Sequence, residues 1–215
     1  MPDYSKLDHW SLKAQKEGYP ARSVYKLKEM DEKFSLIPAG RNGPAAFRVL
    51  DMGAAPGSWS LYILRKLSGR TKTQEGGGPS LVAIDLSPLS RAYDQGLFEK
   101  PDFVFIQGDF TLSEIREAVL SRGPYNLLVS DAAPATSGNR SLDTLRSLEL
   151  VETALDYAGA ALAAGGSLVV KVFQGGDTGN LLKTMRGLFK TAKSFKPQAC
   201  RPGSFETYYL GLGKN

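Results

Sequence analysis

The sequence contains a single cysteine, Cys200, and a single histidine, His9. One cysteine excludes an internal disulfide, and these two side chains cannot complete a zinc site of nitrogen and sulfur ligands. No apolar run approaches the roughly 20 residues that span a bilayer. Residues 1–10 are polar, so we expect neither a membrane anchor nor a signal peptide. These absences predict a metal-free protein of the reducing cytoplasm, which we expect to be a monomer that does not bind membranes.

Two phosphate-binding motifs are also missing. Residues 47–59 predict a strand, a turn and a helix, the unit that opens a doubly wound α/β sheet. The turn consists of small residues and a proline: Gly53, Ala54, Ala55, Pro56 and Gly57. This spacing differs from G-x-G-x-x-G, and the chain has no G-x-x-x-x-G-K-[ST] run. Asp51 beside the turn would repel phosphate and attract a cation. A positively charged nucleoside such as S-adenosylmethionine therefore fits better, and a tight turn without a ligand is the alternative.

Acidic residues are absent from one long segment near the end of the sequence. Residues 183–201 carry six basic side chains and no acidic one, and residues 1–48 carry nine basic and six acidic side chains, in a chain of net charge +5. The sequence between these two segments is therefore acidic. This distribution predicts that RNA contacts the basic ends while the middle binds a cationic ligand, and solvated basic faces without a partner are the alternative.

The 215 residues suit a single domain, in which a basic arm and helix (1–46) precede a catalytic α/β core (47–215). Strand patterns occur at 47–50, 81–86, 103–107, 125–130, 167–173, 191–196 and 205–212. The connection between the last two strands is too short for a parallel crossover, so they should pair antiparallel. We predict a Rossmann-like α/β fold: a seven-stranded, mostly parallel sheet with one antiparallel strand and helices on both faces.

Several local signals place the helices and loops. Helices are expected from Pro20 to Phe34 and directly after the turn at 53–57. Further helices are expected over 88–96, 111–121, 142–163 and 177–189. Thr111 and Glu114 form a capping-box pattern, and Gly165-Gly166 is expected to close the helix that precedes the fifth strand. Residues 38–44 and 69–80, rich in glycine and other small or polar residues, predict loops.

Four aspartates, Asp51, Asp85, Asp109 and Asp131, follow or end successive predicted strands. Carboxyl ends of parallel strands meet at one edge of the sheet, where ligands bind. A single aspartate there is usually a helix cap, but four favour a shared site. Asp85 suits the hydroxyls of a ribose, and Asp109 suits an adenine amine whose ring packs on Phe110 or Leu86. Asp51 and Asp131 are expected nearest the sulfonium and amino groups.

Lys171 interrupts the apolar run 168–173, which should be a strand buried on both faces. An unpaired ammonium there would be costly, so Lys171 needs a partner, and Asp131 on the neighbouring strand is the obvious one. A purely structural ion pair, or a lysine that reaches solvent, is the alternative. Glu206 begins the strand that runs backwards, and it should therefore lie at the same edge.

Seven segments together carry a resemblance to a known family: residues 14–18, 22–27, 51–59, 107–110, 130–134, 165–175 and 204–208. On these segments the chain resembles the FtsJ/RrmJ family of RNA ribose 2′-O-methyltransferases, and within it the bacterial enzymes that methylate a uridine of large-subunit rRNA. It implies the class I methyltransferase fold, S-adenosylmethionine as cofactor, and large-subunit rRNA or the 50S subunit as partner. One departure is Ser58, where a second glycine is usual, and another is the longer loop at 71–79.

The resemblance also implies roles for individual residues. Its catalytic Lys-Asp-Lys-Glu tetrad corresponds to Lys26, Asp131, Lys171 and Glu206. Its cofactor contacts correspond to Gly57, Trp59, Asp85, Asp109 and Asp131. Lys171 would be a general base if neutral, or would orient the hydroxyl and stabilise the developing alkoxide if charged.

Two other functions remain open at this stage. A small-molecule methyltransferase would explain the predicted cofactor residues but would leave the basic ends without a role. A non-catalytic RNA-binding or ribosome-assembly module could retain the cofactor pocket, and it would show salt-dependent RNA binding without methyl transfer.

Overall fold

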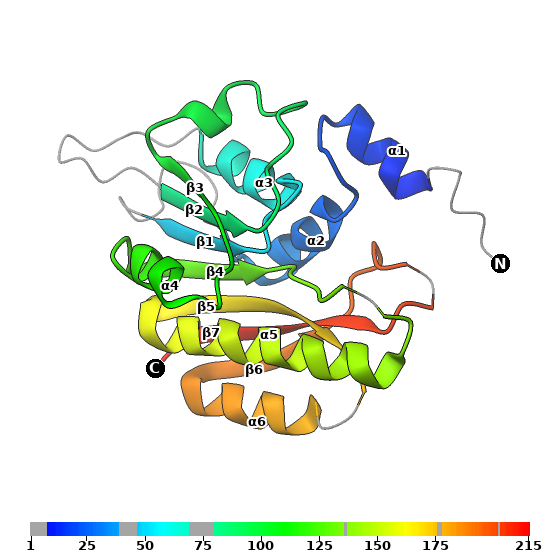
Figure 1. Cartoon of the computed structure of the whole chain (residues 1–215), viewed down its shortest axis with the longest axis vertical. Helices are drawn as coiled ribbons and strands as arrows, with labels where there is room; N and C mark the ends of the chain where they lie inside the picture. Colours follow the sequence, from blue (N-terminus) through cyan, green and yellow to red (C-terminus); the bar gives the residue numbers. More distant parts are fainter. Residues whose placement is uncertain (1–7, 39–46, 69–79, 136, 176–177, 202) are drawn as a thin grey trace.

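The computed structural model describes residues 8–38, 47–68, 80–135, 137–175, 178–201 and 203–215 (Figure 1). The expected loops at 38–44 and 69–80 lie almost wholly outside the described residues. The helices are α1 (His9–Lys16), α2 (Val24–Phe34), α3 (Ser58–Leu67), η1 (Leu97–Glu99), α4 (Ser113–Leu120), α5 (Arg140–Ala161) and α6 (Thr178–Leu188). The strands are β1 (Arg48–Met52), β2 (Ser80–Asp85), β3 (Phe103–Gln107), β4 (Tyr125–Ser130), β5 (Leu162–Phe173), β6 (Phe189–Phe195) and β7 (Glu206–Lys214).

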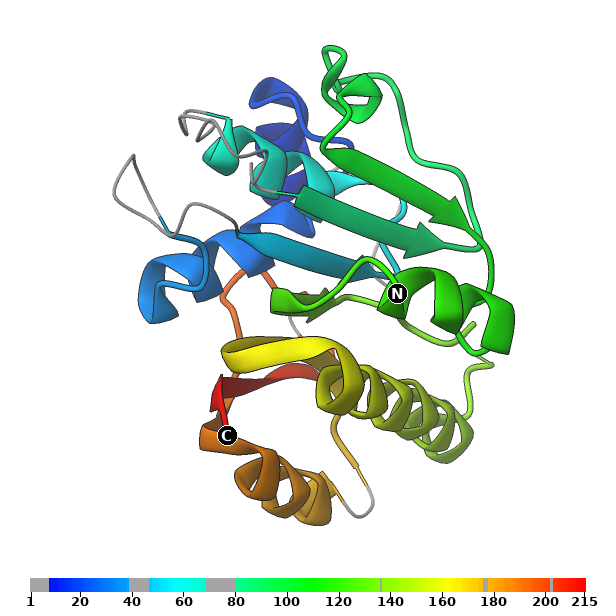
Figure 2. The ribbon, with the colours of Figure 1, turned by 90° about the vertical axis from the view of Figure 1, so that its left-hand side faces the viewer.

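The seven strands form one sheet in the order β3-β2-β1-β4-β5-β7-β6. Strands β1 to β5 pair in parallel, and β7 is antiparallel to both β5 and β6. This confirms the predicted mostly parallel sheet with one antiparallel strand, and the antiparallel pairing of the last two strands. Figure 2 shows the arrowheads of β1, β2 and β3 pointing toward the same edge of the sheet.

Apolar side chains cover both faces of the sheet, as expected for parallel strands crossed by helices. In β4, Leu127 joins the core cluster that contains side chains of α2 and α3, while its neighbour Leu128 joins the cluster that contains side chains of α4, α5 and α6. Both leucines are fully buried. Figure 1 shows the two groups of helices on opposite sides of the sheet. The helices on both faces are therefore confirmed.

Two predicted helix signals are wrong. The pattern at 88–96 forms no α-helix. Instead, the Ser90 N–H donates to Pro56 O at 3.0 Å, and a short 3₁₀ helix, η1, follows. The capping box at Thr111 does not form, because the Thr111 N–H and hydroxyl donate to Asp109 Oδ1 at 2.9 and 2.7 Å. Helix α4 begins at Ser113, after Leu112, without a side-chain cap.

Two helix boundaries also differ from the prediction. Helix α2 begins at Val24, four residues after Pro20. The pair Gly165-Gly166 does not close α5, which ends at Ala161, but lies inside β5. Gly165 has φ +78°, and the pairing of β4 with β5 shifts register between Tyr125 and Leu127. The glycines therefore accommodate an irregular start of β5.

Candidate active site

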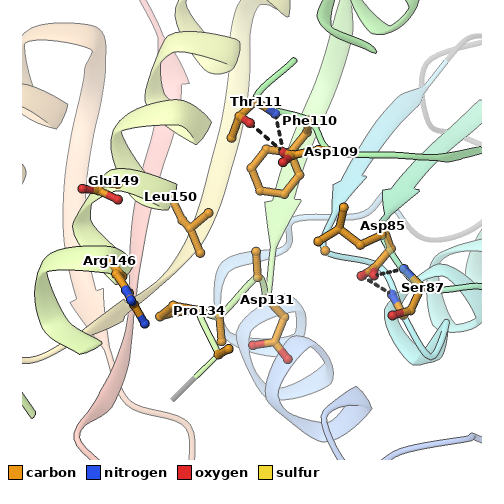
Figure 3. A pocket seen from close by; sticks show the side chains of 16 residues that line it. Asp85, Ser87, Asp109, Phe110, Thr111, Asp131, Pro134, Arg146, Glu149 and Leu150 are labelled. Atoms are coloured by element: carbon orange, nitrogen blue, oxygen red, sulfur yellow. Dashed lines mark hydrogen bonds between the residues drawn. The ribbon is translucent and has the colours of Figure 1, made fainter. Parts of the chain in front are cut away.

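The carboxyl ends of the parallel strands surround a cavity of about 650 Å³. Figure 3 shows the carboxylates of Asp85, Asp109 and Asp131 spaced around it, with Arg146 and Glu149 of α5 on the far wall. Six residues predicted for the cofactor line this cavity: Gly53, Asp85, Leu86, Asp109, Phe110 and Asp131. Sequence reasoning missed the wall from α5, because nothing in the helical pattern indicates which end of the helix reaches the cavity.

The turn after β1 needs glycine at its first position. Gly53 has φ +73°, and a Cβ there would lie 2.7 Å from the Cα of Ala132, which follows β4. No side-chain motion could relieve a clash with backbone, so only glycine lets the two strand ends come this close. The turn is also held by Asp85, whose Oδ2 accepts the Ala55 N–H at 2.9 Å.

Asp85 and Asp109 each accept hydrogen bonds from nearby backbone. Asp85 Oδ1 accepts the Ser87 N–H at 2.8 Å, in addition to the bond from Ala55. A carboxylate has about four lone-pair sites, so acceptor capacity remains for hydroxyls of a ligand. These bonds fix both carboxylates at the cavity wall without neutralising their charge.

Five other residues predicted for the cofactor are placed differently. Asp51, Ala54, Pro56, Gly57 and Trp59 do not belong to the cavity lining found among the described residues. The Trp59 indole N–H donates to Ser23 O at 2.8 Å, and its ring packs 5.9 Å from that of Tyr208. Asp51 is 1% exposed and accepts the Ser60 hydroxyl at 2.6 Å. That these five residues contribute to cofactor binding stays a prediction.

Burial raises the pKa of Asp51 to about 7; the bond from Ser60 opposes this rise, and the charges of Asp131 and Asp85 add to it. In an unfolded chain this carboxyl has a pKa of about 3.9. Between about pH 4 and 7 the folded state thus binds more protons than the unfolded state, so this group lowers stability as pH rises through that window. Above about pH 7 the cost is constant.

We therefore expect Asp51→Asn to stabilise the ligand-free protein at pH 8 by up to about 4 kcal/mol, the equivalent of about three pKa units. At pH 4 the two proteins should differ little, because the wild-type carboxyl is then neutral in the folded state and only about half ionised in the unfolded chain. Urea unfolding at the two pH values measures this difference. A gain of the same size at both would show that Asp51 does not titrate as described.

The four residues predicted as a catalytic tetrad form two ion pairs. Lys171 Nζ lies 3.0 Å from Asp131 Oδ1, which confirms the predicted partner, and Lys26 Nζ lies 3.0 Å from Glu206 Oε2. The two lysines are each 8% exposed. Tyr208, which sequence reasoning did not single out, donates its hydroxyl to Asp131 Oδ1 at 2.6 Å. Tyr208 belongs to the segment 204–208 that carries the family resemblance, but no role was predicted for it.

The charges of this cluster are mutually supporting. Burial raises the pKa of Asp131, but Lys171 and Lys26, with the bond from Tyr208, more than offset this and hold it below the ordinary value. Burial lowers the pKa of Lys26, but Asp131 and Glu206 more than offset this and raise it. Burial, followed by the charges of Asp131 and Glu206, raises the pKa of the Tyr208 hydroxyl well above normal. Asp131 and Lys26 are therefore charged at neutral pH, and Tyr208 is a hydrogen-bond donor.

A second cavity, of about 510 Å³, opens beside the tetrad. Lys26 and Glu206 line it, together with Arg22, Ser23, Phe173, Arg201, Ser204 and Phe205. Asp131 lines the first cavity and pairs with Lys171. The buried charges thus lie between one cavity with acidic walls and another with three basic side chains and two aromatic rings.

The described residues contain neither a cluster suited to a metal ion nor a helix that could span a membrane. No group of three or more histidine, cysteine, aspartate or glutamate side chains within them could hold a metal ion. None of the helices in the described ranges is long and apolar enough to cross a membrane. Cys200 is buried, and burial raises the pKa of its thiol to about 12, so it is not a thiolate nucleophile at neutral pH.

Comparison with known proteins links this arrangement to RNA-modifying enzymes. The FtsJ-like methyltransferase family model matches residues 19–214. The ribosomal RNA large subunit methyltransferase E of Treponema denticola is 50% identical over 210 residues, covering 97% of this chain and 96% of that protein. The protein of the same name from Borrelia garinii subsp. bavariensis is 41% identical over 204 residues, covering 95% of each chain.

Solved structures show the same fold. A crystal structure from Plasmodium falciparum, assigned as a ribosomal RNA methyltransferase, superposes with a TM-score of 0.70 at 25% identity, covering 91% of this chain and 98% of that one. The Methanococcus jannaschii fibrillarin pre-rRNA processing protein superposes with a TM-score of 0.52 at 13% identity, covering 86% of this chain and 75% of that one. At this low identity the second likeness concerns the fold alone.

Proposed function

This chain belongs to the FtsJ-like methyltransferase family, and from that premise we propose that it methylates a ribose 2′-hydroxyl of large-subunit rRNA with S-adenosylmethionine as donor. The observation that carries the proposal is the pair of cavities joined by the buried tetrad. One cavity suits a cationic nucleoside and the other suits an anionic chain with bases. A small-molecule methyltransferase would not need the basic cavity. We infer that the protein acts in the cytoplasm.

The first cavity fits the proposed cofactor by the chemistry of its walls. Asp85 would accept the ribose hydroxyls, Asp109 the adenine amine, and Phe110 and Leu86 would contact the ring. Leu86 is 68% exposed, and a large apolar side chain open to a cavity is suited to an aromatic ligand. When bound, S-adenosylmethionine would supply an electrophilic methyl group: the 2′-oxygen bonds to the methyl carbon, the carbon–sulfur bond breaks with its electron pair left on sulfur, and the hydroxyl proton is released to water.

Lys171 would act as a charged residue that orients the attacking oxygen. Its ammonium contacts both Oδ1 and the carbonyl oxygen of Asp131, at 3.0 and 2.5 Å. An ammonium has three protons, so one is left for the ribose oxygen. Asp131 stays ionised and holds the Lys171 side chain beside the first cavity, which supports stabilisation of negative charge on the oxygen as its role.

Methyl transfer from labelled cofactor tests the proposal. Large ribosomal subunits and their deproteinised rRNA would be prepared from a strain that lacks this protein and incubated with the purified chain. We expect labelled methyl in large-subunit rRNA, recovered as a 2′-O-methylated nucleoside after digestion. Label on a base would contradict the ribose assignment. Salt-dependent RNA binding without any incorporation would identify a binding module instead.

A further inference from the structure

The segment that enters α2 is attached to the beginning of α3. Ser58 Oγ accepts the Ala21 N–H at 2.8 Å and donates to Ala21 O at 3.1 Å. The next residue, Trp59, donates its indole N–H to Ser23 O at 2.8 Å. Ser58 is 1% exposed, so water does not replace these bonds while the protein is folded. A single serine therefore satisfies both backbone groups of a residue 37 positions earlier.

The attachment connects the two cavities. On one side, α3 follows directly from the turn that contains Gly53 and Ala55, which line the first cavity. On the other side, Ala21 is followed by Arg22, Ser23 and Lys26, which line the second cavity. Figure 1 shows α2 and α3 packed side by side. Ser58 thus ties the wall of the basic cavity to the framework of the acidic one.

The same segment also supports the opposite wall of the basic cavity. Arg22 donates to Ala199 O at 2.5 Å, in the connection between β6 and β7. In α2, the Glu29 carboxylate accepts the N–H groups of Gln198 and Ala199 at 2.7 and 2.9 Å. That connection continues to Arg201 and Glu206. Displacement of the segment at Ala21 would therefore disturb both walls.

Resting on the proposed function, we propose that Ser58 is a positioning residue for RNA: it holds Arg22 and Lys26 where the RNA substrate binds, without contacting RNA or cofactor. Its loss leaves the Ala21 N–H without its partner and leaves Ala21 O with only the 3.4 Å bond from the Val24 N–H, at a partly buried position, so the segment is expected to move. Because the first cavity is lined by Gly53 and Ala55 and not by Ser58, cofactor binding is preserved.

Steady-state kinetics of Ser58→Ala test this role. We expect the KM for rRNA to rise about tenfold, the equivalent of one buried hydrogen bond or slightly more, and the dissociation constant of S-adenosylmethionine to stay within twofold. Ser58→Cys, which keeps the side-chain shape but is larger and forms weaker hydrogen bonds, should give an intermediate KM. Tyr125→Phe is the matched control, because it removes a buried bond of 2.8 Å to Val119 O away from both cavities. It should cost similar stability and leave both constants unchanged.

Two results would overturn the proposal. An unchanged KM for rRNA in both Ser58 variants would remove Ser58 from RNA binding. A cofactor dissociation constant that rises as much as the KM for rRNA would make Ser58 an ordinary part of the cofactor turn. Failure of the proposed function is separate, because it would appear as absent methyl transfer in the wild-type protein.

Discussion

Replacing Lys171 with alanine should reduce methyl transfer by about 10³-fold, within the range found when a proton-handling or orienting group is removed. Burial raises the pKa of Asp131, and the charge of Lys171 is the strongest of the effects that lower it. In its absence Asp131 retains Tyr208 and Lys26 as partners, but the attacking oxygen loses its donor. Affinity for S-adenosylmethionine should change less than threefold. Single-turnover incorporation of labelled methyl and titration calorimetry measure the two quantities.

The loss must be separated from general destabilisation, since removal of one partner from a buried ion pair can cost about 3–5 kcal/mol. Lys214→Ala is a suitable control. Lys214 ends β7, and its ammonium donates to Gly159 O and Leu162 O at 2.6 and 2.8 Å; none of these three residues lines either cavity. It should keep full activity. If Lys171→Ala turned over at a near-normal rate, Lys171 would have no part in the mechanism.

Asp85→Ala should weaken binding of S-adenosylmethionine between about tenfold and a hundredfold, the loss of one or two charge-assisted hydrogen bonds. The variant also removes the acceptor for Ala55 N–H and Ser87 N–H, so the turn after β1 loses a support. Asp85→Asn keeps the shape and one acceptor oxygen, and it should weaken binding less. Calorimetry with the isolated protein gives both constants directly.

Asp156→Asn provides the comparison for Asp85. Asp156 lies on α5 and pairs with Arg116 at 2.9 Å, and its side chain is 64% exposed. Loss of that charge should leave cofactor affinity unchanged. Equal affinity of Asp85→Ala and wild-type protein would show that the carboxylate at the end of β2 does not bind the cofactor.

The strands were predictable because their signal is local and strong. Both faces of the sheet are buried, so β4 and β5 appear in the sequence as apolar runs, and carboxylates mark the ends of β1, β2 and β4. The position of Lys171 inside such a run was enough to predict its pairing with Asp131. The insertion of β7 between β5 and β6 was not predicted, because strand order depends on contacts across the whole chain.

The helix ends and part of the site were not predictable, because long-range or competing hydrogen bonds decide them. Thr111 bonds to Asp109 in place of capping α4. The Asp51 carboxylate accepts the hydroxyl of Ser60, which joins β1 to α3. The apolar pattern of the strand does not indicate this bond. The bonds of Ser58 and Glu29 join segments 37 and 169 residues apart. Tyr208 lies in an apolar strand, where a tyrosine indicates packing as readily as a hydrogen bond.

The antiparallel strand β7 has a consequence for biosynthesis. It lies between β5 and β6, although both precede it in the sequence, and it carries Glu206 and Tyr208 to the tetrad. A nascent polypeptide that has not reached residue 206 therefore has a gap in its sheet and an unpaired Lys26. The two ion pairs of the tetrad, and the bond from Tyr208 to Asp131, are therefore complete only late in synthesis.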